Sequence, residues 1–113
     1  MKIDYICQKD AEKIIPTANM AIISIVNKDG TRKLHEGWAY RLDMEFNDIT
    51  QPLSKEYDGH YKLFDALMAK TLWAFVKALP KSVDTIIIHC LAGLSRSATV
   101  AKVLCEYYGE PFP

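Results

Sequence analysis

The sequence lacks the features that would place the chain in a specialised class of protein. Its 14 basic and 14 acidic side chains give a net charge of zero, so no overall basic field attracts nucleic acid or acidic membranes. No apolar run approaches the roughly 20 residues that span a bilayer, and the N-terminus has no signal-peptide core. Internal repeats and low-complexity tracts are also absent. We therefore expect one domain over residues 1–113, with no nucleic-acid or membrane partner.

Cysteine is scarce as well. The three cysteines, Cys7, Cys90 and Cys105, form neither a disulfide framework nor a zinc-finger spacing, and the three histidines have no ligand-like spacing. This pattern predicts no metal or other cofactor. It also predicts a reducing, cytoplasmic compartment, which would preserve a reactive thiol.

Apolar strand-like segments alternate with amphipathic helical ones. The pattern predicts strands at 2–7, 21–27, 40–46 and 83–89, and helices at 8–15, 61–79 and 97–108. The fold class is therefore α/β, with a central, mostly parallel sheet of about four strands flanked by helices. The apolar spacing predicts that two helices bury Phe64, Leu67, Met68, Leu72, Phe75 and Leu79, and Val100, Val103, Leu104 and Tyr107, respectively.

The most informative segment runs from the apolar strand at 86–88 to Ser97. Open α/β sheets place ligands at the C-terminal ends of their strands, where this segment has a short loop before a helix. Gly93 allows an unusual backbone angle, so the loop can turn its N–H groups around one centre at the positive end of the helix. Arg96 adds a charged fork that grips two oxygens. The segment predicts a site for phosphate or a similar oxyanion.

Cys90 lies at the base of this predicted loop. A helix N-terminus and a nearby cation lower the pKa of a cysteine below its ordinary value. We therefore expect Cys90 to be a thiolate nucleophile near neutral pH.

His89-Cys90, five intervening residues and Arg96-Ser97 resemble the signature of the cysteine-dependent protein tyrosine and dual-specificity phosphatases. The resemblance implies the fold of that family and hydrolysis of phosphomonoesters through a cysteinyl-phosphate. Related domains continue past the loop helix, whereas this sequence ends at Pro113, so we expect a fold that is short at its C-terminus. We expect a monomer or a weak homodimer, in which a second copy could supply the missing support.

The same resemblance assigns roles within the loop. The backbone amides that would hold the phosphate belong to residues 91–96, namely Leu91, Ala92, Gly93, Leu94, Ser95 and Arg96. Ser97 would hydrogen-bond the sulfur and help it to leave, and His89 would have a supporting role that tunes the thiolate.

A general acid should protonate the departing oxygen. Asp48 follows the strand at 40–46, and if that strand is parallel to the Cys90 strand, the two loops open at the same edge of the sheet. Asp58 is the alternative, because it lies 32 residues before Cys90, closer to the family spacing than the 42 residues of Asp48. We prefer Asp48 on its loop position, and we expect Asp43, inside the strand, to be a surface residue.

Other functions remain open on the sequence alone. A rhodanese-like sulfurtransferase and an arsenate reductase also carry a cysteine in an anion-binding loop, and a non-catalytic phosphate-binding interaction module is a third alternative. The expected substrate is a phosphorylated protein or peptide. The choice between phosphotyrosine alone and dual specificity stays open.

Overall fold

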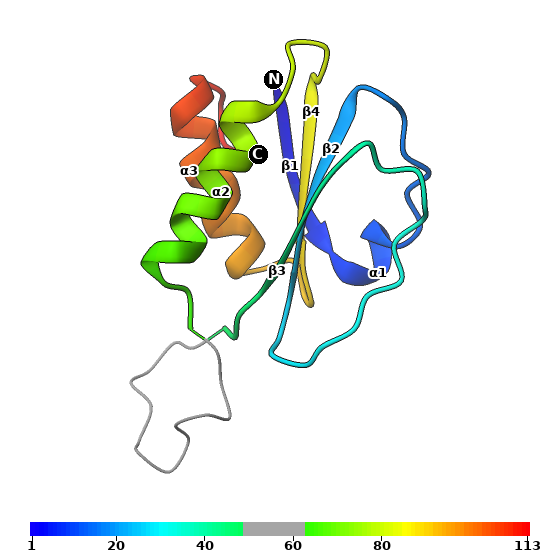
Figure 1. Cartoon of the computed structure of the whole chain (residues 1–113), viewed down its shortest axis with the longest axis vertical. Helices are drawn as coiled ribbons and strands as arrows, with labels where there is room; N and C mark the ends of the chain where they lie inside the picture. Colours follow the sequence, from blue (N-terminus) through cyan, green and yellow to red (C-terminus); the bar gives the residue numbers. More distant parts are fainter. Residues whose placement is uncertain (49–62) are drawn as a thin grey trace.

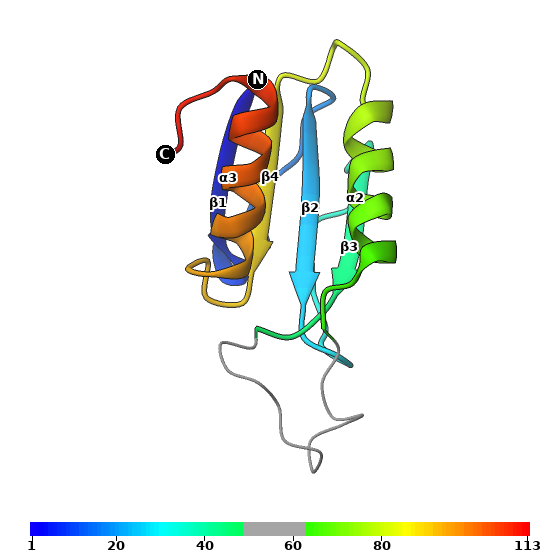
Figure 2. The same cartoon turned by 90° about the vertical axis from the view of Figure 1, so that its left-hand side faces the viewer.

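Four parallel strands form one sheet in the order β1-β4-β2-β3. The computed structural model describes residues 1–48 and 63–113. The strands are β1 (Lys2–Cys7), β2 (Met20–Val26), β3 (Tyr40–Glu45) and β4 (Thr85–Cys90), and the helices of the described residues are α1 (Gln8–Ala11), α2 (Ala66–Ala78) and α3 (Arg96–Tyr108). Helices α2 and α3 cover one face of the sheet, and α1 lies on the other (Figures 1 and 2). The predicted α/β class and parallel sheet are confirmed.

Strand β4 lies inside the sheet, between β1 and β2. Its isoleucines alternate between two cores: Ile86 and Ile88 face the α2 and α3 side, and Ile87 faces the α1 side. All three are buried, as expected for a strand that is covered on both faces. Helix α1 is short, so side chains from the segment between β2 and β3, Leu34 and Trp38, complete the second core.

The predicted helix at 8–15 is wrong in its length, because α1 ends at Ala11. The next residues form tight turn bonds in which the Lys13 and Ile14 amides donate to the Asp10 and Ala11 carbonyls. These bonds span three residues rather than the four of an α-helix, so the helical pattern ends before Pro16 is reached.

Helix α2 begins later than predicted, at Ala66. Asp65 caps it by accepting a hydrogen bond of 2.8 Å from the Met68 amide. Two residues of its predicted apolar face are exposed: Phe64 (44%) precedes the helix, and Leu67 (71%) lies about 140° around the helix axis from buried Leu72.

The predicted face of α3 is also partly wrong. The helix buries Ser97, Val100, Ala101, Leu104 and Cys105, whereas Val103 and Tyr107 are 41% and 50% exposed. The buried stripe faces the sheet, and Tyr107 points sideways to contact Trp73 of α2, with ring centroids 5.1 Å apart. No helix of residues 1–48 and 63–113 is long and apolar enough to cross a membrane.

Substitutions at the neighbours Val103 and Leu104 test which face of α3 is buried. Replacing fully buried Leu104 with alanine should lower the free energy of unfolding by about 2–5 kcal/mol, because the change leaves a cavity under α3. Val103→Ala should change the free energy of unfolding by less than about 1 kcal/mol. Urea denaturation of the two variants measures the difference, and equal losses would contradict the observed face of α3.

Candidate functional site

The C-terminal ends of β2, β3 and β4 meet at one edge of the sheet, because the strands are parallel. The residues that follow them are Asn27 after β2, 46–48 after β3 and 91–95 after β4. Hydrogen bonds join the first two segments: the Lys28 amide donates to Asn47 Oδ1, and the Phe46 amide donates to the Val26 carbonyl. The sheet therefore holds three loops next to one another.

The loop after β4 bends back over the end of β1. Gly93 has a φ of +70°, which confirms the expected unusual backbone angle. A Cβ at this position would lie 2.5 Å from both the Cys7 amide nitrogen and the Ile6 carbonyl carbon. The Gln8 amide also donates to the Leu91 carbonyl at 3.2 Å. Only glycine fits this contact without displacing the backbone of β1.

Cys90 is buried at the base of the loop, and its sulfur has two close polar neighbours. Ser97 Oγ lies 3.1 Å from Sγ, and the Gly93 amide donates to Sγ at 3.2 Å. Burial acts to raise the pKa of Cys90, but hydrogen bonds from the Ser97 hydroxyl and from the amides of Ser97, Gly93 and Ser95 outweigh it, so the pKa is lowered. The geometry therefore favours the thiolate.

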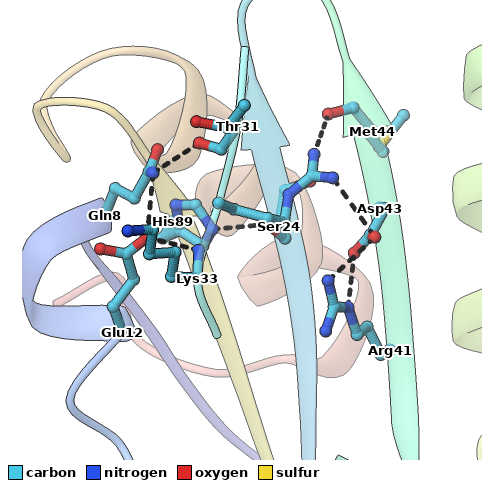
Figure 3. Close-up of polar contacts among 10 residues, drawn as sticks. Gln8, Glu12, Ser24, Thr31, Lys33, Arg41, Asp43, Met44 and His89 are labelled. Atoms are coloured by element: carbon cyan, nitrogen blue, oxygen red, sulfur yellow. Dashed lines mark hydrogen bonds and ion pairs between the residues drawn. The ribbon is translucent and has the colours of Figure 1, made fainter. Parts of the chain in front are cut away.

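His89 is fully buried on the opposite face of β4 from Cys90. Its Nε2 lies 2.6 Å from Ser24 Oγ of β2 (Figure 3). Its Nδ1 lies 3.4 Å from the Cys90 carbonyl oxygen. Burial lowers the pKa of His89, which favours the neutral ring. Our sequence interpretation missed Ser24, although a lone hydroxyl residue within the apolar strand 20–26 is a detectable signal.

Polar contacts fix the segment between β2 and β3, residues 27–39, over the face of the sheet that carries His89. Glu12 accepts hydrogen bonds from the Lys33 amide at 2.6 Å and from Gln8 Nε2 at 3.1 Å, and these lower its pKa (Figure 3). Arg32 donates to the Met44 carbonyl at 3.1 Å and pairs with Asp43 at 3.3 Å. Asp43 is exposed, as expected. It lies within β3, where it pairs with Arg32 and Arg41, and not in the loop that follows the strand.

Arg96, the first residue of α3, reaches across the ends of β2 and β3. Its Nη1 donates to Asn27 Oδ1 at 2.7 Å and to the Phe46 carbonyl at 2.8 Å. Its Nε is buried and has no hydrogen-bond partner in the described part of the chain. A buried donor without a partner is costly, and an oxyanion in the loop would satisfy it. The sequence did not reveal Asn27 as the residue that anchors this side chain.

Asp48 lies beside the loop. Its Oδ1 accepts a hydrogen bond of 3.3 Å from Ser95 Oγ, so the structure brings Asp48 to the Cys90 loop. Because the Ser95 hydroxyl is used in this way, it does not cap α3. The N-terminus of α3, whose Ser97 amide bonds the Cys90 sulfur, carries the partial positive charge that attracts an anion. Asp58, the alternative acid, lies outside the described residues.

The rest of the loop is open to solvent. Leu91, Ala92, Leu94 and Ser95 are exposed, whereas Gly93 is buried. No cluster of three or more potential metal ligands occurs within residues 1–48 and 63–113. Comparison of the chain with protein-family models, curated proteins and solved structures finds no match.

Two glycines with the same backbone conformation test the loop. Gly93 and Gly109 have φ values of +70° and +68°, but a Cβ at Gly109 would meet nothing within 4 Å. Gly109→Ala should cost about 1–2 kcal/mol of stability from backbone strain alone. Gly93→Ala should cost more and should also slow alkylation of Cys90, because the amide that bonds the sulfur must move. Urea denaturation and iodoacetamide labelling at pH 7 measure both effects, and equal behaviour of the two variants would refute the contact with β1.

Proposed function

We propose that this protein hydrolyses phosphate monoesters through a cysteinyl-phosphate intermediate. One observation carries the proposal: Cys90 Sγ, held by Ser97 Oγ and the Gly93 amide, shares its loop with Arg96, whose buried Nε lacks a partner among the described residues. A nucleophile with a lowered pKa and an unsatisfied cationic donor at a helix N-terminus suit attack on a dianionic phosphate.

In the first displacement, the Cys90 thiolate attacks phosphorus as the bond between phosphorus and the leaving oxygen breaks. Arg96 and the amides of residues 91–96 hold the phosphoryl oxygens, where charge develops. The Asn27 side chain and the Phe46 carbonyl fix the guanidinium through Nη1, and the remaining donors would bind the phosphate. Asp48 gives a proton to the leaving oxygen.

In the second displacement, water attacks phosphorus and the sulfur–phosphorus bond breaks. Asp48, now a carboxylate, accepts the proton of the water. The Ser97 hydroxyl donates to the departing sulfur and stabilises the thiolate. Inorganic phosphate leaves, and the enzyme returns to its starting state.

His89 supports the nucleophile from the other face of β4. The contacts of its ring with Ser24 and with the Cys90 carbonyl fix its orientation. This orientation fixes the strand end from which the Cys90 side chain projects. We assign Ser24 and His89 positioning roles rather than direct contact with substrate.

The proposed substrates are phosphomonoesters of proteins or peptides in a reducing cytoplasm. Sulfur transfer and arsenate reduction would use the same loop, but arsenate reduction also needs relay thiols. Cys105 suits that role poorly, because burial raises its pKa and its thiol donates to the Pro111 carbonyl. The engaged Asp48 favours phosphate hydrolysis, which needs an acid at this position.

Substitution of the proposed nucleophile and acid tests the mechanism. Cys90→Ser should abolish turnover of p-nitrophenyl phosphate, because the hydroxyl is not ionised near neutral pH. Asp48→Asn should lower kcat for phenyl phosphate by about 100- to 10,000-fold, and less for p-nitrophenyl phosphate, whose leaving group needs little protonation. Asp43→Asn is the matched control and should retain kcat. Full turnover by Cys90→Ser would end the proposal, and an unaffected Asp48→Asn would exclude Asp48 as the acid.

The lowered pKa of Cys90 predicts the pH dependence of its reactivity. Because the thiolate persists below the pH at which an ordinary thiol is protonated, iodoacetamide labelling of Cys90 should continue to a lower pH than labelling of an ordinary cysteine. Ser97→Ala should raise the pKa and move the loss of labelling to higher pH. Cys105 serves as an internal control that should label slowly throughout. Mass spectrometry of peptides measures each site, and identical profiles for Cys90 and Cys105 would contradict thiolate stabilisation.

A further inference from the structure

An apolar groove of about 460 Å³ lies between α2 and α3, beside the Cys90 loop. Helix α3 lies over β1 and β4 and α2 lies toward β3, so the ribbons stand apart on the same face of the sheet (Figure 2). The groove is lined by apolar side chains from both helices and from the end of β3, among them Phe46, Phe64, Leu72, Trp73, Val100 and Val103.

The groove begins at the candidate site. Asp48, Ser95 and Arg96 line it together with the apolar residues, so its polar end is the edge of the sheet where phosphate would bind. In the other direction, the lining on α3 ends at Val103, seven residues after Arg96, or about 10 Å along the helix axis. An apolar group attached to a bound phosphate therefore has a walled space beside it.

Two hydroxyls in the described walls already have partners: the Thr99 hydroxyl donates to the Ser95 carbonyl at 2.9 Å, and the Ser95 hydroxyl donates to Asp48. These hydroxyls offer a peptide backbone no free donor, and backbone groups placed against the apolar side chains would lose hydrogen bonds to water, which is costly. A hydrocarbon or aromatic group has no such requirement.

We infer that the preferred substrate is a small amphiphilic phosphate monoester, whose phosphate binds in the Cys90 loop and whose bulky apolar group fills the α2–α3 groove. This inference rests on the proposed function and changes its substrate class, because an aryl or branched-alkyl phosphate takes the place of a phosphorylated peptide. Arg96 recognises the charged end, and the side chains of α2 and α3 bury the apolar end.

A pair of esters with similar leaving oxygens tests the inference. Phenyl phosphate and 4-cyclohexylphenyl phosphate differ only in an added apolar ring, so the chemical step is matched. Burial of that ring should raise kcat/KM for the cyclohexyl ester at least about tenfold over phenyl phosphate. A phosphotyrosine peptide with polar flanking residues should be a poorer substrate than the cyclohexyl ester.

Substitutions in the groove test whether it causes the preference for the cyclohexyl ester over phenyl phosphate. Val103 is 41% exposed, so Val103→Asp should fold while it places a charge in the wall, and it should reduce the ratio of the two kcat/KM values to near one. Val103→Trp should reduce the same ratio by filling the space. Ile15→Asp, at an apolar residue that is 75% exposed and lies outside the groove, is the matched control and should leave the ratio unchanged.

The outcomes separate this inference from the proposed function. If wild type hydrolyses both esters with a ratio within about twofold of one, the groove assignment is wrong and the proposed function stands. The groove assignment is equally wrong if the ratio survives both Val103 variants, or if the phosphotyrosine peptide is the best substrate. If wild type hydrolyses none of the three compounds, the proposed function fails and this inference fails with it.

Discussion

Parallel pairing of β4 between β1 and β2 is the constraint on which the rest of the structure depends. Because both neighbours run in the same direction, the residues that follow β2, β3 and β4 are delivered to one edge of the sheet. Arg96 then reaches Asn27 and the Phe46 carbonyl, and Ser95 reaches Asp48. Each contact joins loops that are distant in sequence, so the site forms only when the sheet is assembled.

The two faces of β4 have different roles. On one face, Ile86 and Ile88 bury apolar surface beneath the helices, and the strand finishes at Cys90. On the other, the apolar pattern is interrupted by His89, which contacts Ser24 in the adjacent strand. A fully buried imidazole costs stability unless it is hydrogen-bonded, so Ser24 offsets a cost that His89 imposes directly behind Cys90.

Sequence alone predicted the parts of this arrangement that depend on local pattern. The strand of isoleucines and the left-handed Gly93 follow from residue type and order, whereas the position of Asp48 next to the loop was predicted on the condition that its strand is parallel to β4. The contacts of Asn27 and Ser24 could not be predicted, because they depend on which strands become neighbours. The exposure of Val103 and Tyr107 was missed for a related reason. Helical spacing identifies an apolar stripe, but the separation of α2 from α3 decides how much of that stripe is covered.

The contact of Gly93 with the backbone of β1 makes the reactivity of Cys90 a consequence of completed folding. The two partners come from opposite ends of the sequence, so the contact exists only where β1 and β4 are paired. This contact fixes the loop whose Gly93 amide donates to the sulfur. A chain in which β1 is detached from β4 therefore lacks the contact that holds this donor, and its Cys90 is closer to an ordinary thiol.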